Sequence, residues 1–128
     1  MSDATARKRP KFLALHQIRL PLPGIVSILH RVSGAGLFLM LPLLLWLFDR
    51  RLGSPVAYDA YRDVVSNPLV KIVLFGLRWA YLNHFCAGIR FLLLDVHVGV
   101  DLEPARRSSM VVLIVSIVLT LAIGVALW

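Results

Sequence analysis

The chain has 128 residues, of which 59% are hydrophobic and only 16% are charged, and its formal net charge is +7. A soluble domain is about half apolar and about a quarter charged, and a chain this short has too little interior to hide the excess apolar surface. A lipid bilayer is therefore the expected solvent. The basic charge does not indicate nucleic-acid binding, because most Lys and Arg residues lie near the ends of apolar stretches.

The chain contains one cysteine, Cys86, which lies inside an apolar run. A lone cysteine excludes an internal disulfide, and no metal-ligand spacing surrounds it. At the N-terminus, the basic residues 7–9 and Lys11 are not followed by a clean apolar stretch and a small-residue cleavage site. We therefore expect no signal peptide. We also expect no mitochondrial presequence, because the segment is short and Arg9-Pro10 interrupts any amphipathic helix, and this favours a bacterial inner membrane over the mitochondrial inner membrane.

Residues 1–24 are polar and basic, and we expect them to form a surface segment with little regular structure. Pro21 and Pro23 disfavour a helix immediately before the first apolar stretch. Residues 25–48 are predicted to form the first membrane-spanning helix, since no charged residue occurs between Val32 and Phe48.

The rest of the chain alternates between polar loops and apolar stretches. Residues 49–68 form a loop with a short helix predicted around Tyr58–Val65, and residues 69–94 form the second predicted span. Residues 95–109 form a second loop, and residues 110–128 form an uncharged third span that covers about 28 Å as a helix, close to one hydrocarbon thickness. All 128 residues are thus predicted to form one all-α integral membrane domain with three transmembrane helices.

The distribution of basic residues predicts how these helices are oriented. The N-terminal segment and the second loop together hold seven Lys or Arg residues, and the first loop holds three. Basic residues in short flanks favour the cytoplasmic side. We therefore expect the N-terminus in the cytoplasm, or in a mitochondrial matrix, and the C-terminus outside. The basic residues predicted on the cytoplasmic side are Arg7, Lys8, Arg9, Lys11, Arg19, Arg106 and Arg107. Those predicted on the outer side are Arg50, Arg51 and Arg62.

His84 is an ionisable residue deep in the second span. It lies ten residues before Leu94, the predicted inner end, and so about 15 Å deep on helix geometry. Gly88 follows one turn later and leaves room for a flat macrocycle to approach the backbone. Neutral imidazole is a common axial ligand to haem iron. The same spacing suits a histidine that is hydrogen-bonded to a neighbouring helix, and the residues alone leave both interpretations open.

His30 and Arg31 lie near the start of the first span. His30 is roughly 8 Å deep on helix geometry, and so about 7 Å shallower than His84. Two axial ligands of one haem should lie at similar depth, so His30 suits a place beside the haem propionates better than a place on the iron. Arg31 pairs well with carboxylates and could reach the same groups. Alternatively, both side chains simply extend to the membrane interface.

Ser27 and Arg31 are four residues apart and share one helix face, which Gly34 continues. A hydroxyl donor and a cationic donor beside a small residue suit a quinone headgroup. Ser27 could hydrogen-bond a carbonyl oxygen, and Arg31 could stabilise the negative charge that develops during reduction. The small residues of this segment are also typical of close helix packing.

Two further arginines lie in the second span. Arg78 has no obvious internal partner, and no specific role is predicted for it. Arg90 lies four residues from the inner end, and we expect it to reach the interface, where Asp95 and Asp101 could supply counter-charge.

Two runs of residues resemble the signatures of a known family. Arg9-Pro10, followed by Ser27 to Gly34 (Ser-Ile-Leu-His-Arg-Val-Ser-Gly), is similar to the first signature of the cytochrome b556 subunit of succinate dehydrogenase. The run from His84 to Phe91, followed by Asp95, is similar to its second signature. The signatures occur in the expected order and at the expected distance, and the resemblance covers nearly the whole chain.

The resemblance implies a membrane anchor that, with a second small anchor subunit, holds a flavoprotein and an iron–sulfur protein. Succinate is oxidised at the flavin, and electrons pass through the iron–sulfur clusters to ubiquinone. The resemblance further implies that His84 is one axial ligand of a b-type haem and that the second anchor subunit supplies the other. It places His30 and Arg31 near the propionates, and Ser27 and Arg31 in the quinone site.

Some positions depart from the family pattern. Phe91 stands where many members carry His, which moves propionate binding onto His30, Arg31 and Arg90. Arg78 matches no feature of the family.

Three functions are weighed. The first is an electron-transfer subunit of succinate:quinone oxidoreductase. It is an incomplete enzyme, because the sequence has neither a Gly-rich dinucleotide fingerprint nor a cysteine cluster. The second is a structural anchor that binds the same partners without haem. The third is a small transporter, which the lack of acidic residues in the spans disfavours.

Overall fold

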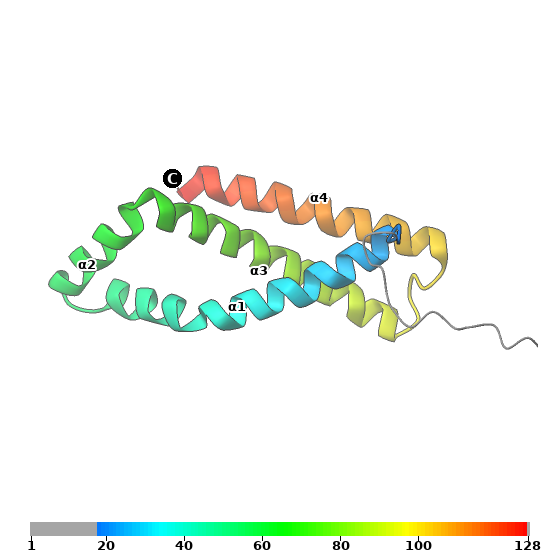
Figure 1. Cartoon of the computed structure of the whole chain (residues 1–128), viewed down its shortest axis with the longest axis horizontal. Helices are drawn as coiled ribbons and strands as arrows, with labels where there is room; N and C mark the ends of the chain where they lie inside the picture. The colour runs from blue at the N-terminus through cyan, green and yellow to red at the C-terminus, as the bar shows by residue number, and fades with distance from the viewer. Residues whose placement is uncertain (1–17, 128) are drawn as a thin grey trace, which may run out of the picture.

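The computed structural model describes residues 18–127. Most of the basic N-terminal segment, including the predicted cytoplasmic residues Arg7, Lys8, Arg9 and Lys11, lies outside the described residues, as does Trp128. The described part of the chain is helical and contains no strand (Figure 1). The helices are α1 (Leu22–Leu52), α2 (Pro55–Ser66), α3 (Pro68–Asp95) and α4 (Leu102–Leu127).

The predicted all-α fold with three membrane-spanning helices is confirmed. By length and composition, α1, α3 and α4 are each able to cross a membrane. With 31, 28 and 26 residues, they extend for about 46, 42 and 39 Å, so each exceeds a hydrocarbon core of about 30 Å. The helices therefore continue into the polar regions on both sides of a bilayer.

The first helix starts earlier than predicted. Pro21 has an extended backbone and precedes the helix, whereas Pro23 lies within its first turn. Proline is tolerated there because the first amides of a helix have no intrahelical partner to lose. The predicted irregular segment thus ends at Leu20 or Pro21 and does not reach residue 24.

The third long helix also starts before its predicted span, at Leu102 instead of residue 110. Glu103 and Pro104 suit a first helical turn, and Glu103 forms an ion pair with Arg107 one turn later at 3.1 Å. About two helical turns therefore precede the apolar stretch. Charge patterning marks where the apolar stretch begins, but it does not mark where the helix begins.

The short helix predicted around Tyr58–Val65 is confirmed and is longer, since α2 has 12 residues. Ser54 caps its start by accepting a hydrogen bond from the amide of Ala57 at 3.3 Å. Asn67 caps the start of α3 in the same way through Leu69, at 2.9 Å. Two successive caps at Ser54 and Asn67 thus separate α2 from both of its neighbours.

The helix α3 lies in the middle of the molecule and packs against both α1 and α4 (Figure 1). Toward the start of α1, the helices α1 and α3 cross closely, and they separate toward α2, which joins them. Val26, Ala87 and Val112, one from each long helix, form the buried apolar cluster near the crossing.

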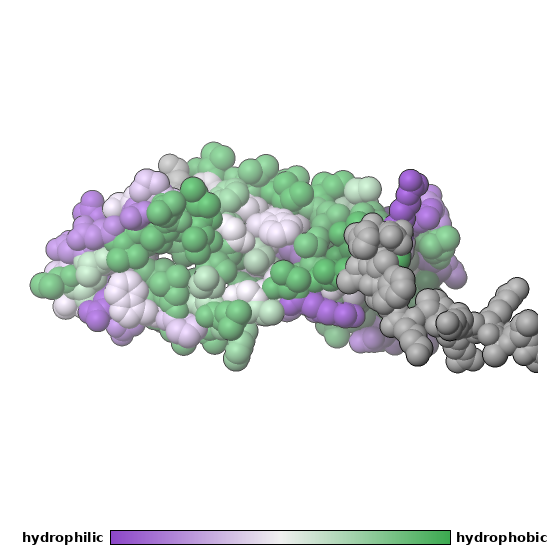
Figure 2. Space-filling view, in the orientation of Figure 1, coloured by the Kyte–Doolittle hydropathy of each residue, from purple (hydrophilic) through white to green (hydrophobic). Residues whose placement is uncertain are grey.

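The polarity of the molecule suits a lipid environment. The outer surface of the long helices carries many exposed large apolar side chains, and Figure 2 shows them as a broad green region between hydrophilic ends. The helix contacts instead bury small polar side chains: Ser33, Asn83, Ser109, Ser116 and Thr120. Apolar residues outside and small polar residues between helices are typical of membrane helix packing.

Candidate functional site

The crossing of α1 and α3 brings together His30 and His84, one from each sequence signature. Their imidazole rings stack with centroids 4.1 Å apart and planes 7° from parallel. Phe91 lies beside His30 with a ring-centroid distance of 5.1 Å. Both histidines are half-buried. The residues at the crossing, His30, Ser33, Gly34, His84 and Gly88, are called the crossing end below.

The hydrogen bonds of His84 determine its tautomer. Its Nδ1 lies 2.9 Å from the backbone carbonyl oxygen of His30 and 3.3 Å from Ser33 Oγ. A carbonyl oxygen has no proton to donate, so Nδ1 must carry the hydrogen and donate it. In a neutral ring this leaves Nε2 with its lone pair. Within residues 18–127, the hydrogen bonds of this ring all involve Nδ1.

Each histidine lies against a glycine of the opposite helix. A Cβ atom placed on Gly34 would lie 2.7 Å from Cε1 of His84, and a Cβ atom on Gly88 would lie 3.7 Å from Nε2 of His30. The first distance is too short for any side chain, and the second is an ordinary contact. Gly88 is expected to leave space beside His84, but in the structure it faces His30. The His84 ring packs against Gly34 instead.

The predicted depth difference of about 7 Å between His30 and His84 is too large for the two imidazole rings, because their centroids are only 4.1 Å apart. Since α1 begins at Leu22, His30 is eight residues into its helix, about 12 Å, and not about 8 Å. The predicted start at residue 25 depends on Pro21 and Pro23, whereas Pro23 lies inside the first turn of α1.

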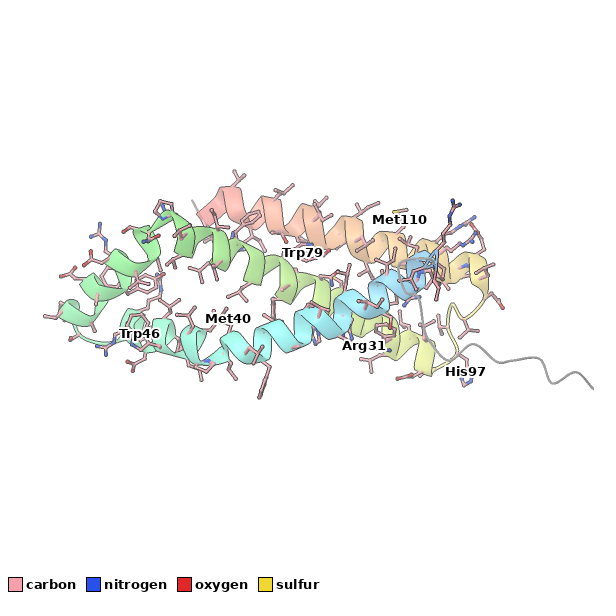
Figure 3. The ribbon with its side chains drawn as sticks, in the orientation of Figure 1. Arg31, Met40, Trp46, Trp79, His97 and Met110 are labelled. Atoms are coloured by element: carbon pink, nitrogen blue, oxygen red, sulfur yellow. The ribbon has the colours of Figure 1, made fainter. Side chains whose placement is uncertain are left out.

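Ser27 and Arg31 lie on α1 at the same end of the bundle as the crossing. Ser27 is half-buried and Arg31 is exposed. Figure 3 shows Arg31 toward the end where the loop with His97 lies, opposite the end that carries Trp46. Gly34, expected to continue the face of Ser27 and Arg31, is instead covered by His84. Ser27 and Arg31 thus lie on α1 next to the residues of the crossing, without Gly34 as an open continuation of their face.

The predicted acidic partners of Arg90, Asp95 and Asp101, are wrong. The Arg90 side chain is only 5% exposed. Its Nε donates to Ser108 Oγ at 2.9 Å, and its Nη2 donates to the carbonyl oxygen of Ala105 at 3.4 Å. Arg90 therefore joins α3 to α4 through neutral acceptors, an arrangement that depends on the early start of α4.

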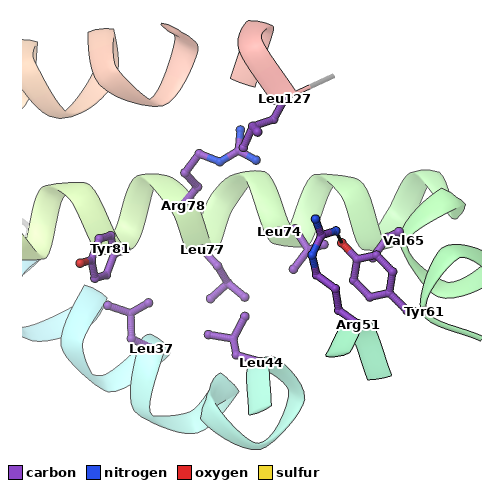
Figure 4. A pocket seen from close by; sticks show the side chains of 10 residues that line it. All are labelled: Leu37, Leu44, Arg51, Tyr61, Val65, Leu74, Leu77, Arg78, Tyr81 and Leu127. Atoms are coloured by element: carbon purple, nitrogen blue, oxygen red, sulfur yellow. Dashed lines mark hydrogen bonds between the residues drawn. The ribbon is translucent and has the colours of Figure 1, made fainter. Parts of the chain in front are cut away.

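Arg78 lies at the opposite end, where α1 and α3 have separated. Its Nη1 lies close to Gly124 of α4, and the side chain points toward Leu127 (Figure 4). On the other side of α3, leucines of α1 and α3 point toward each other across the gap, and Arg51 donates to the hydroxyl of Tyr61 at 3.3 Å. These groups line a cavity of about 610 Å³, called the open end below: Leu37, Leu44, Arg51, Tyr61, Val65, Leu74, Leu77, Arg78, Tyr81 and Leu127.

Comparison with known proteins identifies the family. The family model described as succinate dehydrogenase/fumarate reductase transmembrane subunit matches residues 5–123. The chain belongs to this family. The resemblance that the two signatures carry is thereby confirmed, and the chain is a multi-pass membrane subunit of a succinate dehydrogenase.

The relatives agree with this family along almost their whole length. The chain is 35% identical over 119 residues to the succinate dehydrogenase cytochrome b556 subunit of Paracoccus denitrificans, covering 93% of this chain and 92% of that protein. It is 34% identical to the protein of the same name from Coxiella burnetii, covering 94% and 98%. For the protein of the same name from Rickettsia felis, the identity is 30%, with 92% of each chain covered.

The residues at the crossing end fit a histidine-ligated haem. Histidine ligands to metals donate their second ring hydrogen to a carbonyl or a carboxylate, which fixes the tautomer and the ring direction. His84 makes this bond through Nδ1, and its Nε2 keeps the lone pair that iron requires. Among residues 18–127, His, Cys, Asp and Glu form no cluster of three or more that could hold a metal ion.

Proposed function

We propose that this membrane anchor supplies one axial ligand of a b-type haem and part of the site where ubiquinone is reduced. The observation that carries the proposal is the 2.9 Å contact between Nδ1 of His84 and the carbonyl oxygen of His30. This contact makes Nε2 the only ring nitrogen of His84 that is able to bind iron. When bound, the haem supplies a one-electron carrier beside the quinone site.

The second axial ligand is assigned to the second anchor subunit and not to His30. Two axial ligands of one iron point their nitrogens toward each other from opposite sides of the porphyrin. The rings of His30 and His84 instead lie face to face at 4.1 Å, with no room for a macrocycle between them. A shared haem thus links two membrane subunits, and the name cytochrome b556 of the relatives is consistent with such a group.

His30 and Arg31 are assigned to the haem propionates. His30 lies directly against the proposed ligand, and Arg31 is exposed and able to reach a carboxylate outside this chain. Arg90 does not join them, because its guanidinium is engaged with Ser108 and Ala105. Propionate binding by this chain therefore rests on two residues of α1.

Ser27 and Arg31 are assigned to the quinone. The hydroxyl of Ser27 is placed to donate to a quinone carbonyl oxygen, and the Arg31 cation stabilises the negative charge that forms on reduction. Ser27 lies three residues before His30, less than one helical turn, and Arg31 directly follows His30, so a quinone there is close to the proposed haem ligand His84. The remaining groups of the site come from neighbouring subunits.

The proposed assembly contains a flavoprotein, an iron–sulfur protein and the second small anchor subunit, in a bacterial inner membrane. The N-terminus and the loop between α3 and α4 face the cytoplasm, as the excess of basic residues there favours. The soluble subunits then dock at the end of the bundle that carries the crossing. A C-terminal reporter that is active only outside the cytoplasm should be active if this orientation is right, and an inactive reporter on a membrane-inserted chain contradicts it.

A dithionite-reduced minus oxidised difference spectrum tests the haem. Membranes that express this chain with its partner subunits should show a b-type spectrum, which His84→Leu should remove while the subunits still assemble. An unchanged spectrum in His84→Leu rejects the ligand assignment. The absence of a b-type signal from the assembled wild type supports a haem-free anchor instead.

Separate assays of the two half-reactions test the quinone site. Arg31→Ala should lower succinate:ubiquinone activity by about 10²-fold or more, the effect of removing one preorganised charge-stabilising donor. Succinate oxidation by an artificial acceptor should remain. Equal loss of both activities indicates failed assembly, and full retention of both rejects the role of Arg31.

A further inference from the structure

One turn of α1 surrounds the His84 ring on three sides. His30 stacks on the ring at 4.1 Å, the backbone of Gly34 lies against it, and Ser33 approaches Nδ1 at 3.3 Å. These contacts restrict rotation of the imidazole about its bond to the side chain. They do so from a helix other than the one that carries the ligand.

Gly34 provides the space that the ring occupies. A Cβ atom at this position would lie 2.7, 3.2 and 3.7 Å from Cε1, Nδ1 and Nε2 of His84. The imidazole is rigid, so it cannot yield to a methyl group by bending. Any other residue at position 34 therefore turns the ring or separates α1 from α3.

Ser33 directs the ring through its hydroxyl group. Its side chain is only 6% exposed, and its Oγ donates to the carbonyl oxygen of His30 at 3.0 Å. With its proton committed there, Oγ presents a lone pair to the Nδ1 hydrogen of His84. The same hydrogen thus has two acceptors, and both belong to one turn of α1.

We propose that Ser33 and Gly34 are positioning residues for the proposed axial ligand: together they set the direction of the His84 imidazole plane. The inference rests on the proposed function, because the plane of the ring affects a haem only if Nε2 binds its iron. Groups that orient a metal ligand without touching the metal affect both metal retention and the electronic state of the iron.

Replacement of Ser33 in the assembled complex tests the hydrogen bond. Ser33→Ala should shift the g-values of the low-spin ferric haem in electron paramagnetic resonance, because the imidazole plane loses one of the contacts that fix its direction. It should also speed haem transfer to apomyoglobin about 10-fold, the lower end of the range for lost outer-shell partners. Ser33→Thr keeps the hydroxyl group and should restore both properties. Wild-type g-values and transfer rates in Ser33→Ala overturn the role of Ser33.

Replacement of Gly34 tests whether the His84 ring needs the space that the missing side chain leaves. Gly36 is the matched control. A Cβ atom at Gly36 meets nothing within 4 Å, so Gly36→Ala should keep the wild-type spectrum. Gly34→Ala should lose most of the low-spin signal, whether the ring turns or the crossing opens. A wild-type low-spin signal in Gly34→Ala overturns the role of Gly34. If Gly34→Ala does not assemble, the Ser33→Ala and Ser33→Thr pair decides the inference.

The wild type and His84→Leu separate failure of this inference from failure of the proposed function. If the assembled wild type has no b-type haem, or if His84→Leu keeps it, the proposed ligand is wrong. If His84→Leu loses the haem but Ser33→Ala and Gly34→Ala leave the spectrum unchanged, the ligand is right and the positioning role is wrong.

Discussion

The crossing end and the open end of the bundle differ in how the same two helices meet. At the crossing end, α1 and α3 touch through glycines and polar side chains, and the contact from Nδ1 of His84 to the carbonyl oxygen of His30 is 2.9 Å. At the open end, the same helices face each other through leucines across a cavity of about 610 Å³. Small residues let backbones approach, whereas large apolar residues hold the helices apart.

This difference indicates where the chain tolerates change. Close backbone contact leaves no room for an added atom, and buried polar groups there depend on particular partners. A cavity lined by flexible leucines has room to adjust. Substitutions of the same kind should therefore have large effects at the crossing end and small effects at the open end. The four predictions below compare these regions through the free energy of unfolding of the purified chain, measured by SDS titration in mixed micelles with circular dichroism.

Ala87→Leu should have the largest effect. Ala87 is fully buried in the cluster with Val26 and Val112, so the added atoms overpack the place where the three long helices meet. We expect a loss of about 3 kcal/mol. Gly76→Leu, on the same helix but with open space around it, should be neutral or slightly stabilising. Similar losses for Ala87→Leu and Gly76→Leu contradict the proposed difference in packing.

Ser108→Ala should lower the stability by about 2 kcal/mol, since it leaves the buried Nε of Arg90 without its 2.9 Å acceptor. The matched control is Ser66→Ala beside the open end, where the hydroxyl donates to the Asp63 carbonyl oxygen in an exposed position. The control should change stability by less than about 0.5 kcal/mol. A loss in Ser108→Ala no larger than that of Ser66→Ala argues against Arg90 as a link between α3 and α4.

Asn83→Leu should raise the stability by about 1 kcal/mol. Asn83 is fully buried, and within residues 18–127 neither its Oδ1 nor its Nδ2 has a hydrogen-bond partner. An apolar side chain of similar size removes this penalty. A destabilised Asn83→Leu reveals a hydrogen bond made by Asn83 with a group outside the described residues, such as a bound water.

Arg51→Gln should have the smallest effect, below about 0.5 kcal/mol, because its 3.3 Å hydrogen bond to Tyr61 is exposed. Tyr61→Phe, which removes the other partner of the same bond, should be equally mild. A loss above 1 kcal/mol in either variant would give the open end a structural role similar to that of the crossing end.

The long elements could be predicted from the sequence because each apolar stretch is a local pattern. The position of His84 in α3 and the family signatures around it can also be predicted from the sequence. The stacking of His30 on His84 cannot be predicted in this way, because it depends on where α1 begins and on the angle at which α1 and α3 cross. Pro23 is expected to precede α1, but it lies inside the first turn of this helix.

Contacts between helices account for the other differences. Arg90 was predicted to extend outward because its nearest acids in the sequence are Asp95 and Asp101, yet its acceptors come from α4. Gly34 was interpreted as part of a quinone face or as a small packing residue, and nothing in a local pattern says which ring lies on it. The sequence predicts which residue types belong to the site. It does not predict which side chains of α1, α3 and α4 face one another, because that depends on how the helices are positioned along each other.

The three long helices also differ in how well each one suits lipid by itself. Of the three, α3 has the lowest hydropathy and α4 the highest, and α3 carries both Arg78 and Arg90. The helix α1 contacts α3 at His84 through Ser33 and Gly34. The residues that hold His84 thus also give the least apolar of the three long helices a packing surface within the membrane.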